Sequence, residues 1–266
     1  MFLTISELKE IALLMAGRLK VDYPNFNLSF FRRRLKYVFE KMNLRRPDDL
    51  KRVLDSLLKD DEITYFMAVP GTELFRAPSF WRRLRQLLLS IGDGKRIWIP
   101  CLSSYHELFS VLIILEMCGF RNTQIVVNVI SDKIADDVRN LHLSRKNAET
   151  DRTNFEHLET DLPYDDYVSM TDNGPVLKAG ISDNVSFRHG WFMNTDDEKF
   201  DVIVARNILL AYNRGLHERA IAKLTASLRG QGSVLCLGLM ERPLGSQDAY
   251  DDSMAVDGVY ILKSNE

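Results

Sequence analysis

The sequence predicts an α/β protein in which a doubly wound, mostly parallel sheet follows a small all-α domain and carries a small antiparallel β insertion. Near-continuous apolar runs alternate with amphipathic stretches after residue 95, as in a parallel sheet covered by helices on both faces. Before that point only helical patterns occur. The 266 residues suffice for both parts. We expect a helical domain at residues 1–62, a linker and connecting helix at 63–94, and the α/β domain at 95–266, with the insertion at about 147–186.

The N-terminal part shows apolar residues at helical spacing. Ser6 could cap a first helix, and similar patterns predict a second helix over residues 30–42 and a third from about Pro47. Pro70-Gly71 is a turn signal in the linker, and residues 77–91 form the connecting helix. One face of the first helix consists of apolar residues, namely Leu8, Ile11, Ala12 and Met15.

The α/β domain is predicted from the alternation of strand and helix patterns. Asp172-Asn173-Gly174 interrupts this alternation and is typical of a hairpin turn, because Asn and Gly tolerate positive φ. Strands are expected at residues 95–100, 124–130, 200–206, 232–239 and 258–263, and helices at 103–118, 131–141 and 216–229.

The charge distribution separates the two parts of the chain. The net charge of −2 does not suggest nucleic-acid binding. Residues 1–60 carry a basic surplus of five, with 13 Lys and Arg against 8 Asp and Glu. A run within them, Arg32, Arg33, Arg34 and Lys36, is either a solvated helix face or a contact surface for an acidic protein.

The cysteines favour a reducing compartment. Cys101, Cys118 and Cys236 are odd in number, widely spaced and set in apolar runs, which is typical of reduced, buried thiols. The N-terminal apolar stretch contains charges, and no small-residue cleavage site follows it. No run approaches the length needed to span a bilayer. We therefore expect a cytoplasmic protein without membrane insertion.

The first strand–helix turn of the sheet is the expected ligand site of a doubly wound fold. Residues 100–107 contain no glycine, although a nucleotide-type ligand requires close backbone approach there. Ser104 and Glu107 instead fit a capping box. The second strand ends at Val129, whose side chain cannot accept a hydrogen bond, and Asp132 is expected in the first turn of the next helix. His106 and His189 have no metal partner at ligand spacing, so no metal site is predicted.

Several segments of this chain resemble, in the right order, the motifs of a known family. They resemble the CheR family of chemotaxis-receptor glutamate methyltransferases, which have a class I S-adenosylmethionine-dependent fold. The helical N-terminal domain and the hairpin insertion also correspond to that family. The matching segments are Gly71–Arg76 with Pro78, Phe80 and Trp81; residues 97–115; Ala205–Tyr212; and Leu228–Gly238.

The resemblance implies a site in which some family positions are retained and others altered. Arg76 corresponds to the arginine that orients substrate and cofactor. Other retained positions implied for cofactor binding are Thr72, Glu107, Arg206 and Asn207. The altered ones are Cys101 and Tyr105 for the two turn glycines, His106 for a glutamate, Val129 for the ribose-binding aspartate, Trp191 for an asparagine near the adenine, and Ala211 for the active-site tyrosine.

These alterations favour a non-catalytic protein of this fold, acting in bacterial signalling as a binding or regulatory module. No cofactor is then expected, and Tyr105 and Trp191 would fill the vacated crevice as a packed plug. One alternative is an active protein-glutamate O-methyltransferase that uses S-adenosylmethionine. Another is a binder of a different small ligand, with Tyr105, His106 and Trp191 lining the same crevice. The expected partner is an acidic protein, such as a receptor coiled coil, held by the basic N-terminal domain.

Overall fold

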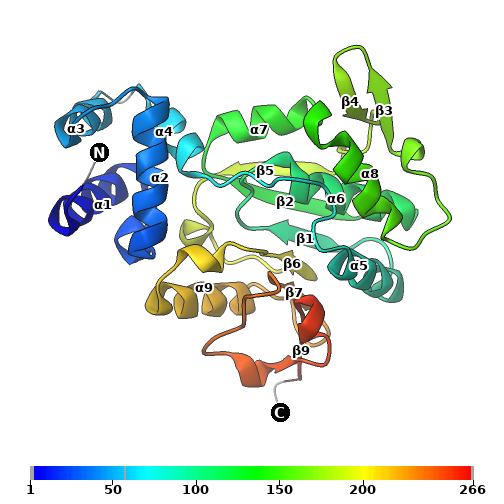
Figure 1. Ribbon diagram of the computed structural model, residues 1–266. Helices are drawn as coiled ribbons and strands as arrows, with labels where there is room; N and C mark the ends of the chain where they lie inside the picture. Colours follow the sequence, from blue (N-terminus) through cyan, green and yellow to red (C-terminus); the bar gives the residue numbers. More distant parts are fainter. Residues whose placement is uncertain (1–2, 57, 265–266) are drawn as a thin grey trace.

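The computed structural model describes residues 3–56 and 58–264, and it confirms the expected fold class (Figure 1). Seven strands form one sheet in the order β5-β2-β1-β6-β7-β9-β8, in which β9 pairs antiparallel with both of its neighbours and the remaining pairs are parallel. The strands are β1 Arg96–Ile99, β2 Gln124–Val129, β5 Val185–His189, β6 Val202–Val204, β7 Val234–Cys236, β8 Tyr250–Asp251 and β9 Val259–Leu262.

The direction of winding reverses at β1, since β2 lies on one side of it and β6 on the other. In open α/β sheets ligands bind at such a point, beyond the carboxyl ends of the strands. The helices that cover the sheet are α5 Pro78–Ile91, α6 Tyr105–Met117, α7 Asp132–Arg139 and α9 Arg214–Ala226.

The strand side chains alternate between two hydrophobic cores. Val127 and Val129 contribute to the core that contains α5, α6 and α7, whereas Val126 contributes to the core that contains α9 and the N-terminal domain. Successive residues of a strand point to opposite faces, so a run of apolar residues can serve both cores. The near-continuous apolar pattern read from the sequence therefore reflects burial on both faces.

The N-terminal domain contains one helix more than the sequence suggested. Its helices are α1 Ile5–Leu19, α2 Leu28–Lys41, α3 Pro47–Asp55 and α4 Asp60–Met67. The expected linker start at residue 63 is wrong, because Ile63 and Met67 of α4 are buried in the core of this domain. Ser6 is not the first cap. Thr4 and Glu7 form a capping box there instead.

The insertion has close to its expected extent of about 147–186, but it is not purely antiparallel β structure. It begins with a helix, α8 Ala148–Glu156, and continues into the predicted hairpin of β3 Val168–Thr171 and β4 Gly174–Leu177. It is followed by β5, which begins at Val185 and pairs with β2 at the edge of the main sheet. The strand β5 escaped prediction because it is half exposed and lies in a polar segment.

Two sets of contacts hold the N-terminal domain over the carboxyl ends of the strands. Asp61 of α4 accepts the backbone N–H of Asp132 at the start of α7 (2.6 Å). The backbone N–H of Asn27 donates to the carbonyl of Ala211 (2.8 Å), which follows β6. No helix in the described part of the chain is long and apolar enough to cross a membrane.

Candidate functional site

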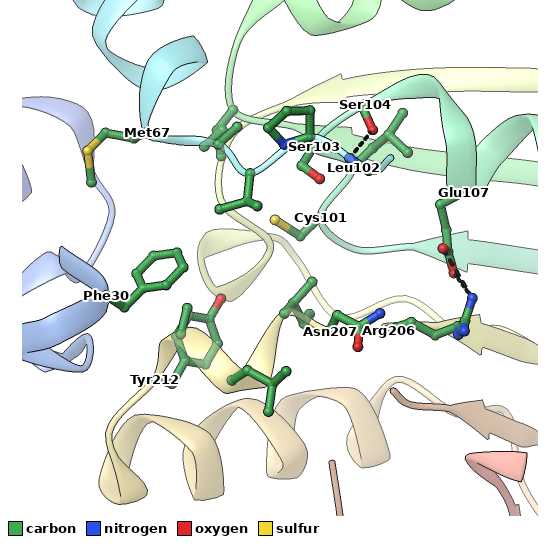
Figure 2. A pocket seen from close by; sticks show the side chains of 18 of the residues that line it. Phe30, Met67, Cys101, Leu102, Ser103, Ser104, Glu107, Arg206, Asn207 and Tyr212 are labelled. Carbon is green, nitrogen blue, oxygen red and sulfur yellow. Dashed lines mark hydrogen bonds and ion pairs between the residues drawn. The ribbon is translucent and has the colours of Figure 1, made fainter. Parts of the chain in front are cut away.

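A cavity of about 480 Å³ lies at the switch point, between the N-terminal domain and the carboxyl ends of β1 and β6 (Figure 2). Pockets of roughly 300–1,000 Å³ are typical of small-molecule sites. The predicted site residues that line it are Thr72, Arg76, Cys101, His106, Glu107, Trp191, Arg206, Asn207 and Ala211. Tyr105 and Val129 are not among its lining residues. The N-terminal domain adds aromatic residues that sequence reasoning missed, chiefly Tyr23, Phe26 and Phe30.

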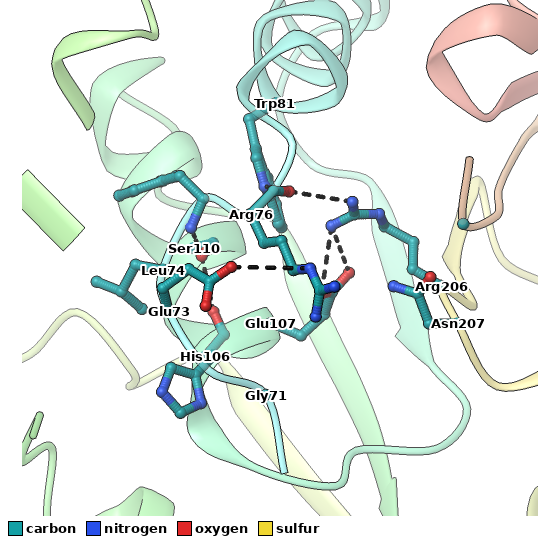
Figure 3. A network of polar contacts seen from close by, with 12 residues as sticks. Gly71, Glu73, Leu74, Arg76, Trp81, His106, Glu107, Ser110, Arg206 and Asn207 are labelled. Carbon is teal, nitrogen blue, oxygen red and sulfur yellow. Dashed lines mark hydrogen bonds and ion pairs between the residues drawn. The ribbon is translucent and has the colours of Figure 1, made fainter. Parts of the chain in front are cut away.

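Glu107 and Arg206 form an ion pair at the edge of the cavity, with Nη1 to carboxylate distances of 3.4 Å (Figure 3). The Arg206 side chain is only 3% exposed, and its Nη2 donates to the carbonyl of Arg76 (3.1 Å). Its guanidinium also lies 4.0 Å from the ring centroid of Phe80 and 5.2 Å from that of Trp81. Burial raises the pKa of Glu107, and Arg206 opposes this shift. These contacts join three segments of the fold, so they serve its structure.

The expected capping box of Ser104 and Glu107 does not form. The Ser104 hydroxyl accepts the backbone N–H of Gly71 (2.7 Å) and lies 3.0 Å from Nδ1 of His106. Glu107 is turned toward Arg206 instead. Asp132 does begin the next helix, as predicted.

Asn207 begins a loop that is organised by a carboxylate the sequence did not reveal. Asn207 has a φ of 60°, in the left-handed region that Asn tolerates. Glu241, only 1% exposed, accepts the backbone N–H groups of Asn207 (2.7 Å), Leu209 (2.6 Å), Leu210 (3.2 Å) and Gly238 (2.6 Å). Desolvation raises the pKa of Glu241 despite these hydrogen bonds. An acid shortly after the apolar strand was the only sequence signal.

Residues 68–77, called the strap below, cross the cavity. Hydrogen bonds from other segments to the backbone groups of the strap hold it in place. Leu74 N–H donates to Asp151 (2.7 Å), and Phe75 N–H donates to the Ser110 hydroxyl (2.9 Å). Asn147 bonds to the carbonyl of Thr72. The Arg76 side chain is 65% exposed, with Glu73 3.7 Å away (Figure 3). Of the retained family positions, Thr72, Arg76 and Asn207 are exposed, whereas Arg206 is buried and Glu107 is partly buried.

The predicted filling of the cavity by Tyr105 and Trp191 is wrong for Tyr105, although Trp191 does line the cavity. Trp191 lines the cavity, is buried, and its Nε1 donates to the Tyr212 hydroxyl (3.4 Å). Tyr105 lies outside the cavity, with its ring 4.0 Å from His106 and 5.0 Å from Phe109 between centroids. Its hydroxyl accepts the backbone N–H of Ser144 (3.0 Å), a backbone bond of the kind expected. As the first residue of α6, Tyr105 packs on the residue four positions later, and this directs the ring away from the crevice.

The end of β2 offers no free polar side chain to the cavity from Asn128 or Val129. Val129 is buried in the core beneath α6 and α7, facing away from the cavity. The polar side chain beside it, Asn128, accepts the Trp98 indole N–H (2.8 Å) and is therefore engaged. Asp132 lies near Asp61 and His189, with one ligand atom of each within 4.8 Å of the others. No carboxylate at this strand end is thus placed to accept a ribose diol in the described cavity lining.

The basic run on α2 is divided among different roles. Arg34 bonds to the carbonyls of Phe66, Met67 and Ala68 and so caps the end of α4. Arg33 lines the cavity. Arg32, Arg33 and Lys36 are all exposed, and Lys36 lies 3.7 Å from Glu40.

Asp151 of α8 is a buried acid whose charge opposes folding. One of its oxygens accepts Leu74 N–H, and the other has no partner among residues 3–56 and 58–264. Burial raises its pKa from 3.8 to about 6. Between about pH 4 and pH 6 the folded state therefore holds more protons than the unfolded state, and this group lowers the free energy of unfolding as pH rises through that window.

Replacing Asp151 by Asn should remove this contribution. The free energy of unfolding of Asp151→Asn minus that of the wild type is expected to become more positive by about 1–3 kcal/mol between pH 4 and pH 7. The cost of the unpaired amide N–H₂ group is independent of pH and cancels from this comparison. Urea unfolding at four pH values measures this stability difference. The control is Glu149→Gln, because Glu149 is an exposed acid of the same helix. A constant difference across the range would contradict the assignment.

Comparison with known proteins confirms the resemblance read from the motifs. No protein-family model matches the chain. The chain is 22% identical over 242 residues to "Putative methyltransferase Cher3" of Pseudomonas putida, covering 89% of this chain and 86% of that protein. It is 25% identical over 224 residues to a chemotaxis protein methyltransferase of Listeria monocytogenes, covering 82% of each. The chain is therefore a divergent relative of the chemotaxis methyltransferases.

The solved structures that resemble the chain are also methyltransferases. An RNA methyltransferase from Salinibacter ruber, in complex with S-adenosyl-L-homocysteine, is 15% identical with a TM-score of 0.38, covering 74% of this chain and 95% of that one. A Listeria monocytogenes structure described as a "putative class I S-adenosylmethionine-dependent methyltransferase" is 11% identical with a TM-score of 0.35, covering 87% of this chain and 71% of that one. TM-scores this low do not by themselves establish a shared fold, and the fold assignment therefore rests on the strand order described above.

Proposed function

We propose that this chain is a non-catalytic member of the chemotaxis-methyltransferase fold, a binding or regulatory module in bacterial signalling. Its relatives are named as chemotaxis methyltransferases, and the fold is shared with them. The observation that carries the proposal is the engagement of one retained pair, Glu107 and Arg206, in the fold itself. Arg206 is enclosed by Glu107, Phe80 and Trp81, and therefore its retention requires no cofactor.

The altered positions support the same proposal. Val129 lies in the core and offers no acceptor to a ribose, and Trp191 places an indole where the family has a small polar side chain. Ala211, at the position of the family's active-site tyrosine, has no hydroxyl that could act in methyl transfer. A lost hydrogen bond to a ligand costs about 0.5–1.5 kcal/mol, and each 1.4 kcal/mol is tenfold in affinity. A polar group of the ligand that is left buried and unpaired costs about 1–3 kcal/mol, so Val129 and Trp191 together are expected to weaken cofactor binding by a factor on the order of 10²–10⁴.

S-adenosylmethionine at about 100 μM is expected to leave the melting temperature of the full-length protein unchanged. A ligand present at a hundredfold excess over its Kd would stabilise the folded state by about 2.7 kcal/mol, which is several degrees for a chain of this size. Thermal shift and isothermal titration calorimetry measure this directly. The Listeria monocytogenes relative, at 25% identity, is the matched control.

An active enzyme is the second candidate, because the cavity is open and Arg76 is accessible at its edge. A clear shift of the melting temperature with S-adenosylmethionine, followed by methyl transfer to a glutamate-containing receptor peptide, would replace the proposal by this one.

An acidic partner remains a prediction for the exposed cations of α2, Arg32 and Lys36. Reversing both charges should weaken capture of such a partner at low salt.

A further inference from the structure

The aromatic side chains of the cavity are the first indication of what it binds. Tyr23, Phe26 and Phe30 approach from the N-terminal domain, and Trp191 and Tyr212 approach from the α/β domain. Phe26 meets Tyr212 edge-on across the domain boundary, with 5.0 Å between centroids. Walls of this kind provide flat apolar faces on both sides of a ligand and favour a planar aromatic ring.

His106 lies in the wall of this space and holds a buried hydrogen-bond donor without a partner in the described chain. Gly71 N–H donates to the Ser104 hydroxyl, so the hydroxyl hydrogen of Ser104 is free to donate to Nδ1 of His106. Burial lowers the pKa of His106 to about 4, and the imidazole is therefore neutral at pH 7. Its proton then resides on Nε2. His106 is 7% exposed and lines the cavity, and its Nε2 has no partner within the described chain.

Two phenol groups add further donors. The Tyr23 side chain is 3% exposed, and its hydroxyl is buried without a hydrogen-bond partner in residues 3–56 and 58–264. The Tyr212 hydroxyl accepts from Trp191, which leaves its own hydrogen available. Burial, together with the neighbouring Cys101 sulfur, raises the pKa of both phenols, and both remain protonated. An unpaired buried polar group costs about 1–3 kcal/mol, so these donors favour a ligand that carries acceptors.

The cations at the cavity favour a negative charge on that ligand. Arg206 is neutralised by Glu107, and Arg76 faces Glu73 at 3.7 Å. Arg33 also lines the cavity, from the exposed face of α2; its guanidinium lies 5.7 Å from the ring centroid of Phe30 and forms no ion pair in the described part of the chain. A positive side chain without a carboxylate partner supports an anionic substituent over a cationic one.

We propose that this cavity binds a planar aromatic anion, whose acceptor atoms bond to His106, Tyr23 and Tyr212 and whose charge faces Arg33. The inference rests on the proposed non-catalytic function, because it assigns the cavity to a ligand other than the methyl donor. The anionic group is a carboxylate or a phosphate, and the two are separated by experiment.

The experiment uses the full chain and four naphthalene probes of matched ring size. The anions are 2-naphthoate and 2-naphthyl phosphate, the neutral probe is 2-naphthamide, and the cation is 2-naphthylmethylammonium. Calorimetry gives the affinities, and quenching of Trp191 fluorescence reports occupancy of the cavity. Trp81 and Trp98 do not line it, and Trp191→Phe should therefore remove the quenching. At least one anion should bind at least tenfold more tightly than the cation.

Two pairs of variants test the residues. Tyr23→Phe removes an unpartnered hydroxyl, so its melting temperature should stay the same or rise while the affinity for the anion falls about 10–100-fold. Tyr37→Phe, on α2 and outside the cavity lining, should change neither. Arg33→Gln should weaken the binding of both anions and leave the binding of 2-naphthamide unchanged. Arg32→Gln, its exposed neighbour, should have no effect.

Three results would overturn the inference: no calorimetric binding of either anion at millimolar concentration, equal binding of anion and cation, or anion binding that Tyr23→Phe and Arg33→Gln leave unchanged. S-adenosylmethionine is titrated in parallel. If S-adenosylmethionine binds and displaces the anion, the proposed function fails. If neither binds, only the present inference fails.

Discussion

Replacing Arg206 by alanine is expected to lower the free energy of unfolding by about 3–5 kcal/mol. The guanidinium is 3% exposed and enclosed by Phe80 and Trp81, and its loss leaves the Glu107 carboxylate without its counter-charge. Burial already raises the pKa of Glu107 against the effect of Arg206. Removing one partner of a buried ion pair costs more than the pair contributes, because the remaining charge is uncompensated.

Urea unfolding at pH 7 measures this loss. In the double variant Arg206→Ala with Glu107→Gln, the stranded charge is absent, and part of the stability should return. Arg76→Ala is the control, since this side chain is 65% exposed and its ion pair is weak. It should cost less than about 0.5 kcal/mol. If Arg206→Ala instead kept wild-type stability, Arg206 would be free for a ligand, and the structural account of the retained family residues would be wrong.

Replacing Glu241 by alanine is expected to destabilise the fold by a similar amount, about 3–5 kcal/mol. Its carboxylate accepts four backbone N–H groups from two loops that are separated in sequence. Each donor left buried and unpaired costs about 1–3 kcal/mol, and water reaching the outer part of the loop, where Leu210 is half exposed, reduces the total. Glu241→Gln keeps one acceptor oxygen and should lose about half as much.

Urea unfolding gives the stability, and amide hydrogen exchange locates the effect. The amides of Asn207, Leu209 and Gly238 should lose protection in Glu241→Ala well below the global unfolding free energy. Glu218→Ala is the matched control, because Glu218 pairs with Arg214 on the surface of α9. Unchanged protection of the three amides would show that other contacts hold the loop.

The sequence by itself determined the secondary elements that have a clear period or a strong turn signal. The alternation of apolar runs correctly predicted five strands of the main sheet, and Asp172-Asn173-Gly174 correctly predicted the hairpin. These are local properties, set by the spacing of side chains on one segment. The missed elements are short or half polar. They are α4, α8, β5 and the two-residue β8, which depend on their neighbours for burial or pairing.

Most of the site residues that the resemblance to the methyltransferase family implied do line the cavity, and the doubly wound pattern predicted its place at the strand ends. Only the tertiary structure decided what those residues do. The ion pair of Glu107 and Arg206 joins residues 99 apart in sequence, and no local pattern records it. Tyr105 has two directions open to its ring, and contacts with Phe109 and Ser144 select the one outside the cavity. The cavity itself exists because a separate helical domain places Tyr23 and Phe26 over the sheet, and such long-range packing is set by the whole fold.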